Sequence, residues 1–249
     1  MNKDPQTHDL WQGLRPEARK QLQERNYAKP ALAARLQTDG AFASEVIDAE
    51  AELRKAGAWI PGVQLFRRTV YDQLHRGSFS ELGRGGEGIF EAVGFWPKQW
   101  ATARMFAGTA KGFHIHPPHI PEGTKPTEWH KRFLDKQNPQ TFFDKEQWDV
   151  MFFLQGRSEF FLVDERDGLP RTAMRFFVGS DADDRANNVV IVIPPGVAHA
   201  LRVEGSTDAI MVYGTSVSFN PAFEGRIASG VETAGMPEDW AAYINATKG

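Results

Sequence analysis

The chain contains no cysteine. A disulfide framework and a thiolate metal site are therefore both impossible, which excludes the disulfide-rich secreted class and the cysteine-bound zinc sites. The sequence also lacks an apolar run near the roughly 18 residues that suggest a membrane-spanning helix. Its first residues, Met-Asn-Lys-Asp-Pro-Gln, have no apolar core of the kind found in signal peptides. We therefore expect a cytoplasmic protein with no membrane partner.

A surplus of positive charge is also missing. The 29 basic and 32 acidic residues give a formal net charge of −3, so there is no basic field to attract nucleic acid, and no nucleic-acid partner is expected. Hydrophobic residues make up 41% of the chain and charged residues 24%, as in ordinary globular proteins. A length of 249 residues suffices for one large domain with an extension.

The first 58 residues differ in composition from the rest. They hold few β-branched residues and many that favour helix, among them Ala, Leu, Gln, Glu, Lys and Arg. Phe42, Val46, Ala49 and Leu53 recur at helical spacing, and Gly57 follows as a helix stop signal. We predict a helical N-terminal extension over 1–58, packed against the main body or against a dimer partner.

Residues 59–249 show short apolar or alternating runs broken by turn residues. We expect strands at Val63–Phe66, Ile89–Val93, Ala101–Phe106, Val150–Leu154, Glu159–Val163, Met174–Val178, Val189–Ile193 and Ala209–Ser216. Many short strands at such spacing predict a β-sandwich or barrel.

A long insertion over 117–148 interrupts these strands. Loops of this length are usually functional or disordered. Its many aromatic residues favour a lid over a pocket, although a surface excursion is the alternative reading: Trp129, Phe133, Phe142, Phe143 and Trp148.

Two histidines stand directly before this insertion. In a strand, His114 and His116 point to the same face, because side chains alternate with period two. Gly112 permits close approach of a neighbouring backbone, and Pro117-Pro118 ends the strand. Such a pair can begin a transition-metal site, hold a substrate or serve as acid and base.

A second segment comes about eighty residues later. The run Val189–Ile193 predicts a buried strand, Pro194-Pro195-Gly196 a turn, and His199 the start of the next strand. Together, Gly-x-His-x-His and Pro-x-Gly-x-x-His are similar to the two halves of the cupin signature. This resemblance implies a mostly β fold, the double-stranded β-helix or jelly roll, with the histidines in one pocket.

The cupin signature also contains a carboxylate with six residues between it and a glycine. Asp149 has that relation to Gly156. The resemblance therefore implies one divalent transition metal (Fe, Mn, Ni, Co or Zn), because nitrogen and oxygen donors suit these ions. Its four ligands would be His114, His116, Asp149 and His199. No organic cofactor is expected.

Several further motifs follow one another in a fixed order: the segment Asp72 to Glu81, Gln99, Lys111-Gly-Phe-His114, Pro194-x-Gly196-x-Ala198-His199, and Tyr213-Gly-Thr-Ser-Val-Ser-Phe-Asn-Pro221. Over residues 60–226 these resemble the dTDP-4-dehydrorhamnose 3,5-epimerase family, a metal-free branch of the cupins. The resemblance implies that His114 is a catalytic base and Tyr213 a catalytic acid.

The same resemblance assigns substrate contacts. The family's segment matching Asp72 to Glu81 binds the diphosphate and base of the substrate across a subunit interface, so a homodimer is expected. By this resemblance the residues that would contact a small-molecule substrate are Arg76, Glu81, Gln99 and Lys111; the insertion adds His119 and His130 as candidates.

Where the chain departs from the family, the changes fall on the chemistry. Asp149 stands where the family has a catalytic lysine, and His116 where it has a glutamine. The second family tyrosine is Phe219, and the aspartate that orients the base has no clear match, Asp239 being a candidate. Two of these changes restore metal ligands of the general cupin signature.

The sequence thus predicts a metal-dependent isomerase or epimerase that acts on a carbonyl-bearing sugar, a nucleotide sugar or a related polar acid. An iron-dependent oxygenase is the alternative enzyme, because histidine and carboxylate cupin sites also bind oxygen. A non-catalytic sugar-binding cupin is the alternative outside enzymes.

Overall fold

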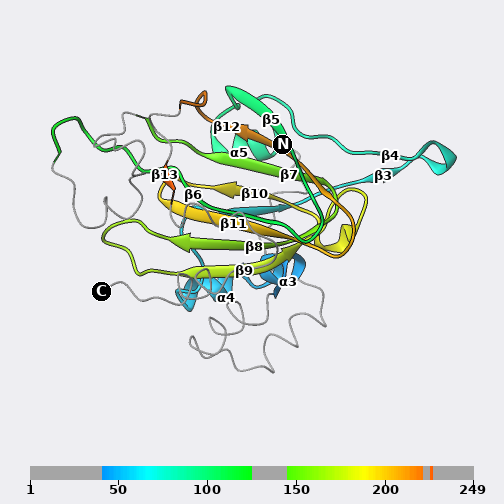
Figure 1. The fold of residues 1–249 in the computed structure, drawn as a ribbon, viewed down its shortest axis with the longest axis horizontal. Coiled ribbons are helices and arrows are strands. Elements are labelled where there is room, and N and C mark those ends of the chain that lie inside the picture. The colour runs from blue at the N-terminus through cyan, green and yellow to red at the C-terminus, as the bar shows by residue number, and fades with distance from the viewer. Residues whose placement is uncertain (1–40, 125–144, 221–224, 227–249) are drawn as a thin grey trace.

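Two mostly antiparallel sheets form the body of the computed structural model, which describes residues 41–124, 145–220 and 225–226 (Figure 1). The six-stranded sheet contains, in spatial order, β1 (Ala41–Phe42), β9 (Ala173–Val178), β8 (Arg157–Asp164), β11 (Val197–Glu204), β6 (Ala110–Ile115) and β13 (Gly225–Arg226). The five-stranded sheet contains β2 (Gln64–Arg67), β10 (Val189–Ile193), β7 (Asp149–Gln155), β12 (Ala209–Thr215) and β5 (Gln99–Met105). The mostly β jelly roll predicted from the sequence is confirmed.

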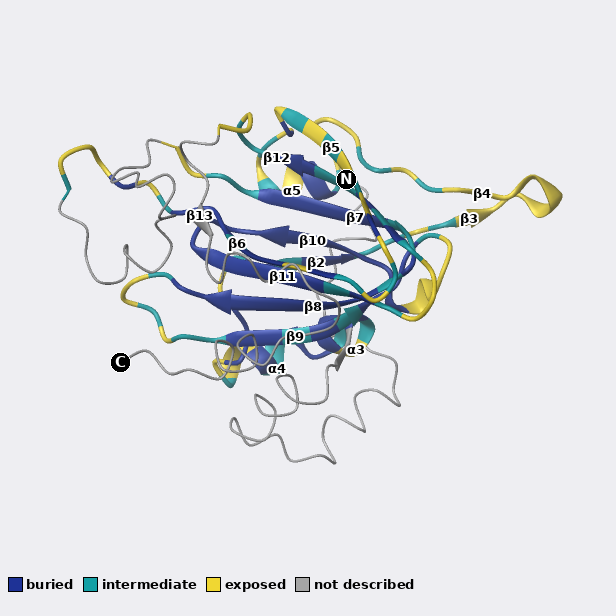
Figure 2. Ribbon diagram, viewed as in Figure 1, coloured by how far each residue is buried: buried dark blue, intermediate teal, exposed yellow. Residues whose placement is uncertain are grey.

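Strand β10 is apolar at every position, as its continuous β-branched sequence shows, and both of its faces are buried. Val189, Ile191 and Ile193 belong to the main core between the sheets, whereas Val190 and Val192 lie in a second cluster on the other face. A strand covered on both faces has no polar positions to alternate with its apolar ones. Figure 2 shows the central strands buried along their length.

The second cluster is covered by a helix where a strand was expected. Residues Ile89–Val93 form the short helix α5, so the strand prediction for this segment was wrong. Gly88 and Gly94, both at positive φ, begin and end the turn. Ile89 and Phe90 then pack as one apolar face on the outside of the five-stranded sheet.

The described part of the N-terminal region contains α3 (Ala43–Asp48) and α4 (Glu50–Lys55). Val46, Ala49 and Leu53 are buried in the main core, as the helical spacing predicted. Phe42, placed in the same predicted helix, lies instead in β1, which pairs in parallel with β9. Residues 1–40, most of the predicted extension, lie outside the described residues. None of the described helices is long and apolar enough to cross a membrane.

A two-stranded ribbon of β3 (Tyr71–Asp72) and β4 (Ser78–Phe79) projects from one end of the body (Figure 1). The two strands are joined by a 3₁₀ turn over Leu74–Arg76; a second such turn, Arg185–Asn187, precedes β10. Tyr71, Leu74 and Phe79 are exposed, Leu74 by 89%. We call residues 71–79 the arm.

The base of the arm is held by a polar network. The Arg68 guanidinium is buried and lies 3.0 Å from an Asp181 carboxylate oxygen. It also donates a hydrogen bond of 2.9 Å to the Ser80 hydroxyl, just beyond the arm. A charge-assisted network of this kind fixes where the arm leaves the body, while the apolar tip stays in solvent.

Candidate functional site

Strand periodicity directs one set of side chains from the five-stranded sheet toward the space between the sheets. Met151 on β7, Met211 on β12 and Met105 on β5 belong to the main core. Counting back by two along β7 brings Asp149 to the same face, and counting forward by two along β12 brings Tyr213 there. Both residues line one cavity, as this register requires.

The opposite wall comes from β6 and β11 of the six-stranded sheet. His114 on β6 is the register partner of His199 on β11, and their ring centroids lie 6.0 Å apart. Gly112 has a φ of +135°, and a Cβ built on it would lie 2.3 Å from the Ala200 Cβ and 2.7 Å from the Ala200 Cα. The close backbone approach predicted at this glycine is therefore present.

Replacing Gly112 by alanine is expected to destabilise the chain by about 3 kcal/mol, because overpacking a tight contact costs about that much. The variant Gly108→Ala is the matched control, since Gly108 also has positive φ but nothing lies within 4 Å of the position that its Cβ would take. We expect a loss of about 1 kcal/mol there from the backbone alone. Urea unfolding of both variants measures the difference, and equal losses would contradict the contact.

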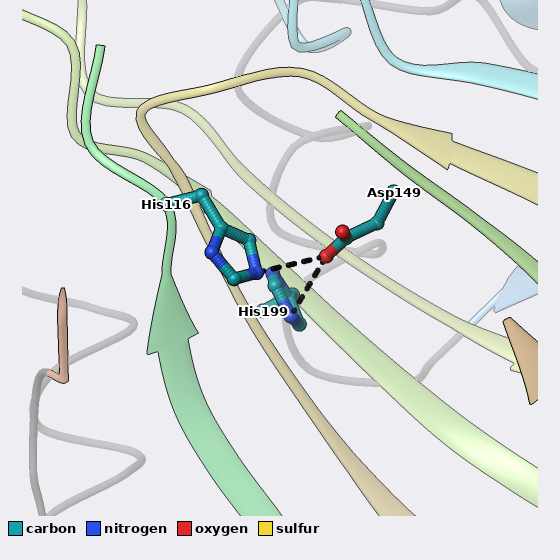
Figure 3. A group of neighbouring side chains, drawn as sticks. All are labelled: His116, Asp149 and His199. Carbon is teal, nitrogen blue, oxygen red and sulfur yellow. Dashed lines mark ion pairs between the residues drawn. The ribbon is translucent and has the colours of Figure 1, made fainter. Parts of the chain in front are cut away.

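Three of the four predicted metal ligands lie together (Figure 3), and all three line this cavity. His116 Nε2 is 3.0 Å from Asp149 Oδ2, and His199 Nε2 is 3.7 Å from the same oxygen. Their ligand atoms all fall within 4.8 Å of one another. Two atoms bound to one ion at about 2.1 Å are about 3–4 Å apart, so the distances of both histidines from Asp149 Oδ2 fit a shared transition metal.

The electrostatic environment suits the same role. Burial lowers the pKa of His199 to about 4, so its imidazole is neutral at pH 7. Burial alone would raise the pKa of Asp149, but the charge and hydrogen bond of His116, with smaller contributions from His199 and Gln147, hold it at about 2. Metal binding requires a neutral imidazole and an ionised carboxylate. The neutral imidazole of His199 and the ionised carboxylate of Asp149 meet this requirement at neutral pH.

The sequence interpretation missed Gln147. Its amide nitrogen donates a hydrogen bond of 3.0 Å to Asp149 Oδ1 and lies 3.2 Å from His116 Nε2. Gln147 thereby orients both side chains, as groups behind metal ligands commonly do. Strand periodicity would have identified it, because Gln147 lies two residues before Asp149 and so faces the same side.

The cavity measures about 220 Å³. Its apolar lining includes the three methionines Met105, Met151 and Met211, with Ala103 and Leu201. Its polar lining includes the predicted catalytic pair and two of the predicted substrate contacts: His114, Tyr213, Gln99 and Lys111. Apolar walls with a few convergent polar groups are typical of small-molecule sites.

The remaining predicted site residues lie outside the cluster of three donors. His114 lines the cavity but is not one of the three clustered donors. Arg76 and Glu81 are exposed, in the arm and just after it, and do not line the cavity of their own chain. His119 is exposed, and its backbone amide lies 3.5 Å from a Glu146 carboxylate oxygen.

Most of the predicted lid lies outside the described residues. The predicted lid residues not described are Trp129, His130, Phe133, Phe142 and Phe143. Asp239, the candidate for orienting the base, is outside them as well. Trp148 is described, and its predicted place over the pocket mouth was wrong. It packs instead in the cluster on the outer face of the five-stranded sheet, because it lies between the inward-facing Gln147 and Asp149.

Comparison with known proteins gives relatives by sequence and by fold. The spore coat polysaccharide biosynthesis protein SpsL of Bacillus subtilis is 29% identical over 181 residues, covering 71% of this chain and 95% of that protein. No protein-family model matches the chain.

Among solved structures, a dTDP sugar isomerase from Desulfovibrio desulfuricans superposes with a TM-score of 0.52 at 15% identity, covering 76% of this chain and 91% of the other. The dTDP-6-deoxy-D-glucose-3,5-epimerase RmlC of Legionella pneumophila gives 0.48 at 20% identity, with coverages of 69% and 75%. At such identities the likeness concerns the fold. The fold that the motif resemblance implies is thus confirmed by the superposition with the dTDP sugar isomerase.

Proposed function

We propose that the chain is a sugar isomerase or epimerase that acts on a nucleotide-linked sugar by metal-assisted proton transfer. One observation carries the proposal: a single cavity brings His114 and Tyr213 together with the clustered His116, Asp149 and His199. The motif resemblance and the similarity to a polysaccharide biosynthesis protein support a sugar substrate.

The clustered donors His116, Asp149 and His199 would hold the metal. A divalent ion bound there supplies Lewis-acid polarisation of the substrate carbonyl, the role that a lysine has in the metal-free family. Asp149 is only 2% exposed, and its negative charge would stabilise a cation bound at this buried site. Gln147 holds the carboxylate in position.

Proton transfer falls to the two cavity residues outside that cluster. His114 is within reach of the same space but apart from the three donors, so we assign it the role of base that removes a proton next to the carbonyl. Tyr213, from β12 of the facing sheet, would return a proton from the other side of the sugar. An acid and a base from opposite walls are what inversion of a carbon centre requires.

The apolar part of the cavity would take the less polar face of the sugar. Met105, Met151 and Met211 offer flexible, polarisable side chains that adapt to an irregular shape. Excluding water there strengthens the interactions of the polar groups at the metal end.

The direct test is incubation with a dTDP-linked 4-keto-6-deoxyhexose, the substrate class that the motif resemblance implies. We expect proton NMR to show an epimer at a carbon adjacent to the carbonyl, with no oxygen consumed. Oxygen uptake by the iron-loaded protein would instead identify the oxygenase. Ligand binding without any product would identify a sugar-binding module.

We further propose that the chain forms a homodimer through the arm. The arm projects into solvent with Tyr71, Leu74 and Phe79 exposed, and isolated two-stranded ribbons are marginally stable in water. Packing on a second copy would bury these side chains and carry Arg76 toward the partner's substrate.

Replacing Leu74 by serine is therefore expected to weaken dimerisation by about 10- to 100-fold, the effect of one apolar side chain at an interface. Phe106→Ser is the control, because Phe106 is 63% exposed but lies outside the arm. Sedimentation velocity over a concentration series measures both. A wild-type chain that is monomeric at micromolar concentration would contradict the proposal.

A further inference from the structure

A second, smaller cavity of about 160 Å³ adjoins the candidate active site. His116 and Gln147 line both cavities, so this pair forms the partition between them. The remaining polar lining of the smaller cavity consists of two lysines, a hydroxyl and an amide: Lys98, Lys145, Ser218 and Asn220. We call it the lysine cavity.

The lysine cavity is built where three parts of the chain end together. Lys98 directly precedes β5, Lys145 and Gln147 precede β7, and Ser218 follows β12. Backbone hydrogen bonds join these parts: Lys98 N donates to the Thr215 carbonyl at 2.9 Å, and Ser216 N donates to the Trp148 carbonyl at 3.0 Å. The rim is therefore held by the strands of the five-stranded sheet.

The charged side chains that line the lysine cavity, among the described residues, are both lysines. No aspartate or glutamate of the described residues lines the lysine cavity, and across residues 41–124 and 145–220 neither Lys98 nor Lys145 forms an ion pair. Two ammonium groups, a hydroxyl and an amide provide donors for the oxygens of an anion. Lysine ammonium groups are common partners of phosphate and carboxylate, and charge-assisted hydrogen bonds are about twice as strong as neutral ones.

We propose that the lysine cavity is a subsite for a compact oxyanion, a carboxylate or phosphate group, carried by the substrate past the His116–Gln147 partition. The inference rests on the proposed function in one respect only, that the main cavity takes a sugar. It adds that the substrate carries an acidic group on the side that faces His116.

Calorimetric titration of the full chain with glucuronate, glucose and inorganic phosphate tests the subsite without turnover. Lys98→Gln and Lys145→Gln each remove one charge and keep a polar side chain. We expect each to weaken binding of an oxyanion by about tenfold, and both together by about a hundredfold, as for lost charge-assisted hydrogen bonds. Glucose binding should not change.

Two control variants locate the effect. Lys55→Gln removes the same charge from α4, where Lys55 pairs with Glu52 at 2.7 Å, and should bind every probe as the wild type does. Lys111→Gln removes the lysine of the main cavity. Unchanged unfolding temperatures would show that all variants are folded.

Each possible result of the titrations supports or overturns the subsite. Lysine-dependent binding of glucuronate supports the subsite with an acidic sugar as its source, and lysine-dependent binding of phosphate alone supports it with a phosphate group as its source. The proposal would be overturned if the wild type bound neither oxyanion, if binding were unchanged in the double variant, or if binding were lost only in Lys111→Gln. Because the titrations measure binding and not turnover, this test and the epimerase assay can each fail without deciding the other.

Discussion

Replacing Asp149 by asparagine is expected to lower the affinity for a divalent metal by at least about 100-fold, because even groups behind the ligands change affinity by 10- to 100-fold. The replacement keeps the shape of the side chain and removes its charge. It also leaves His116 and His199 without the anion that lies 3.0 and 3.7 Å from their Nε2 atoms. Turnover should fall with metal occupancy.

Elemental analysis of the purified variant, followed by titration with Mn²⁺ or Zn²⁺, measures this loss. The fold should persist, because asparagine has the shape of aspartate and buried histidines favour the neutral form when the carboxylate charge is removed. Asp208→Asn is the control: Asp208 pairs with Arg104 at 2.7 Å, away from the cavity lining, and its loss should not affect metal content. An Asp149→Asn chain that retains both metal and full turnover would contradict the assignment.

Replacing Tyr213 by phenylalanine is expected to reduce turnover by about 100- to 10,000-fold, the usual contribution of a general acid or base. Ring packing stays the same and only the phenol hydroxyl is lost, so substrate affinity should change by no more than a few-fold. Single-turnover kinetics together with direct binding measurements separate the two effects.

Thr102→Val is the companion variant. It removes a hydroxyl from an exposed position of β5, the strand paired with β12, and should leave both turnover and affinity unchanged. A Tyr213→Phe chain with unaltered turnover would remove Tyr213 from the chemistry. A protein in which neither variant nor wild type turns over the sugar, yet both bind it, would be a binding module.

The strands were predictable because their periodicity reports burial. Val189–Ile193 is apolar at every position since both of its faces are covered, and this needs no knowledge of its neighbours. The segment Ile89–Val93 has a similarly short apolar run, which alone does not distinguish strand from helix. Its flanking glycines at positive φ, rather than its apolar residues, determine the helical turn.

The candidate site was predicted from the motif resemblance as a group of four ligands, of which the structure brings three together. Motif spacing identified His116, Asp149 and His199, but their proximity depends on β6, β7 and β11 lying in two facing sheets. Sequence spacing alone does not separate His114 from the three clustered donors. The lysine cavity had no sequence signal, because it joins the ends of strands that are far apart along the chain.

Solvent exchange into the sugar tests metal-assisted proton transfer most directly. In D₂O, the protein with metal bound should incorporate deuterium at a carbon adjacent to the carbonyl of a dTDP-linked 4-keto-6-deoxyhexose. Exchange should stop on chelation and return when one equivalent of metal is added. Absence of exchange at full metal occupancy, or undiminished exchange after complete metal removal, would contradict the account.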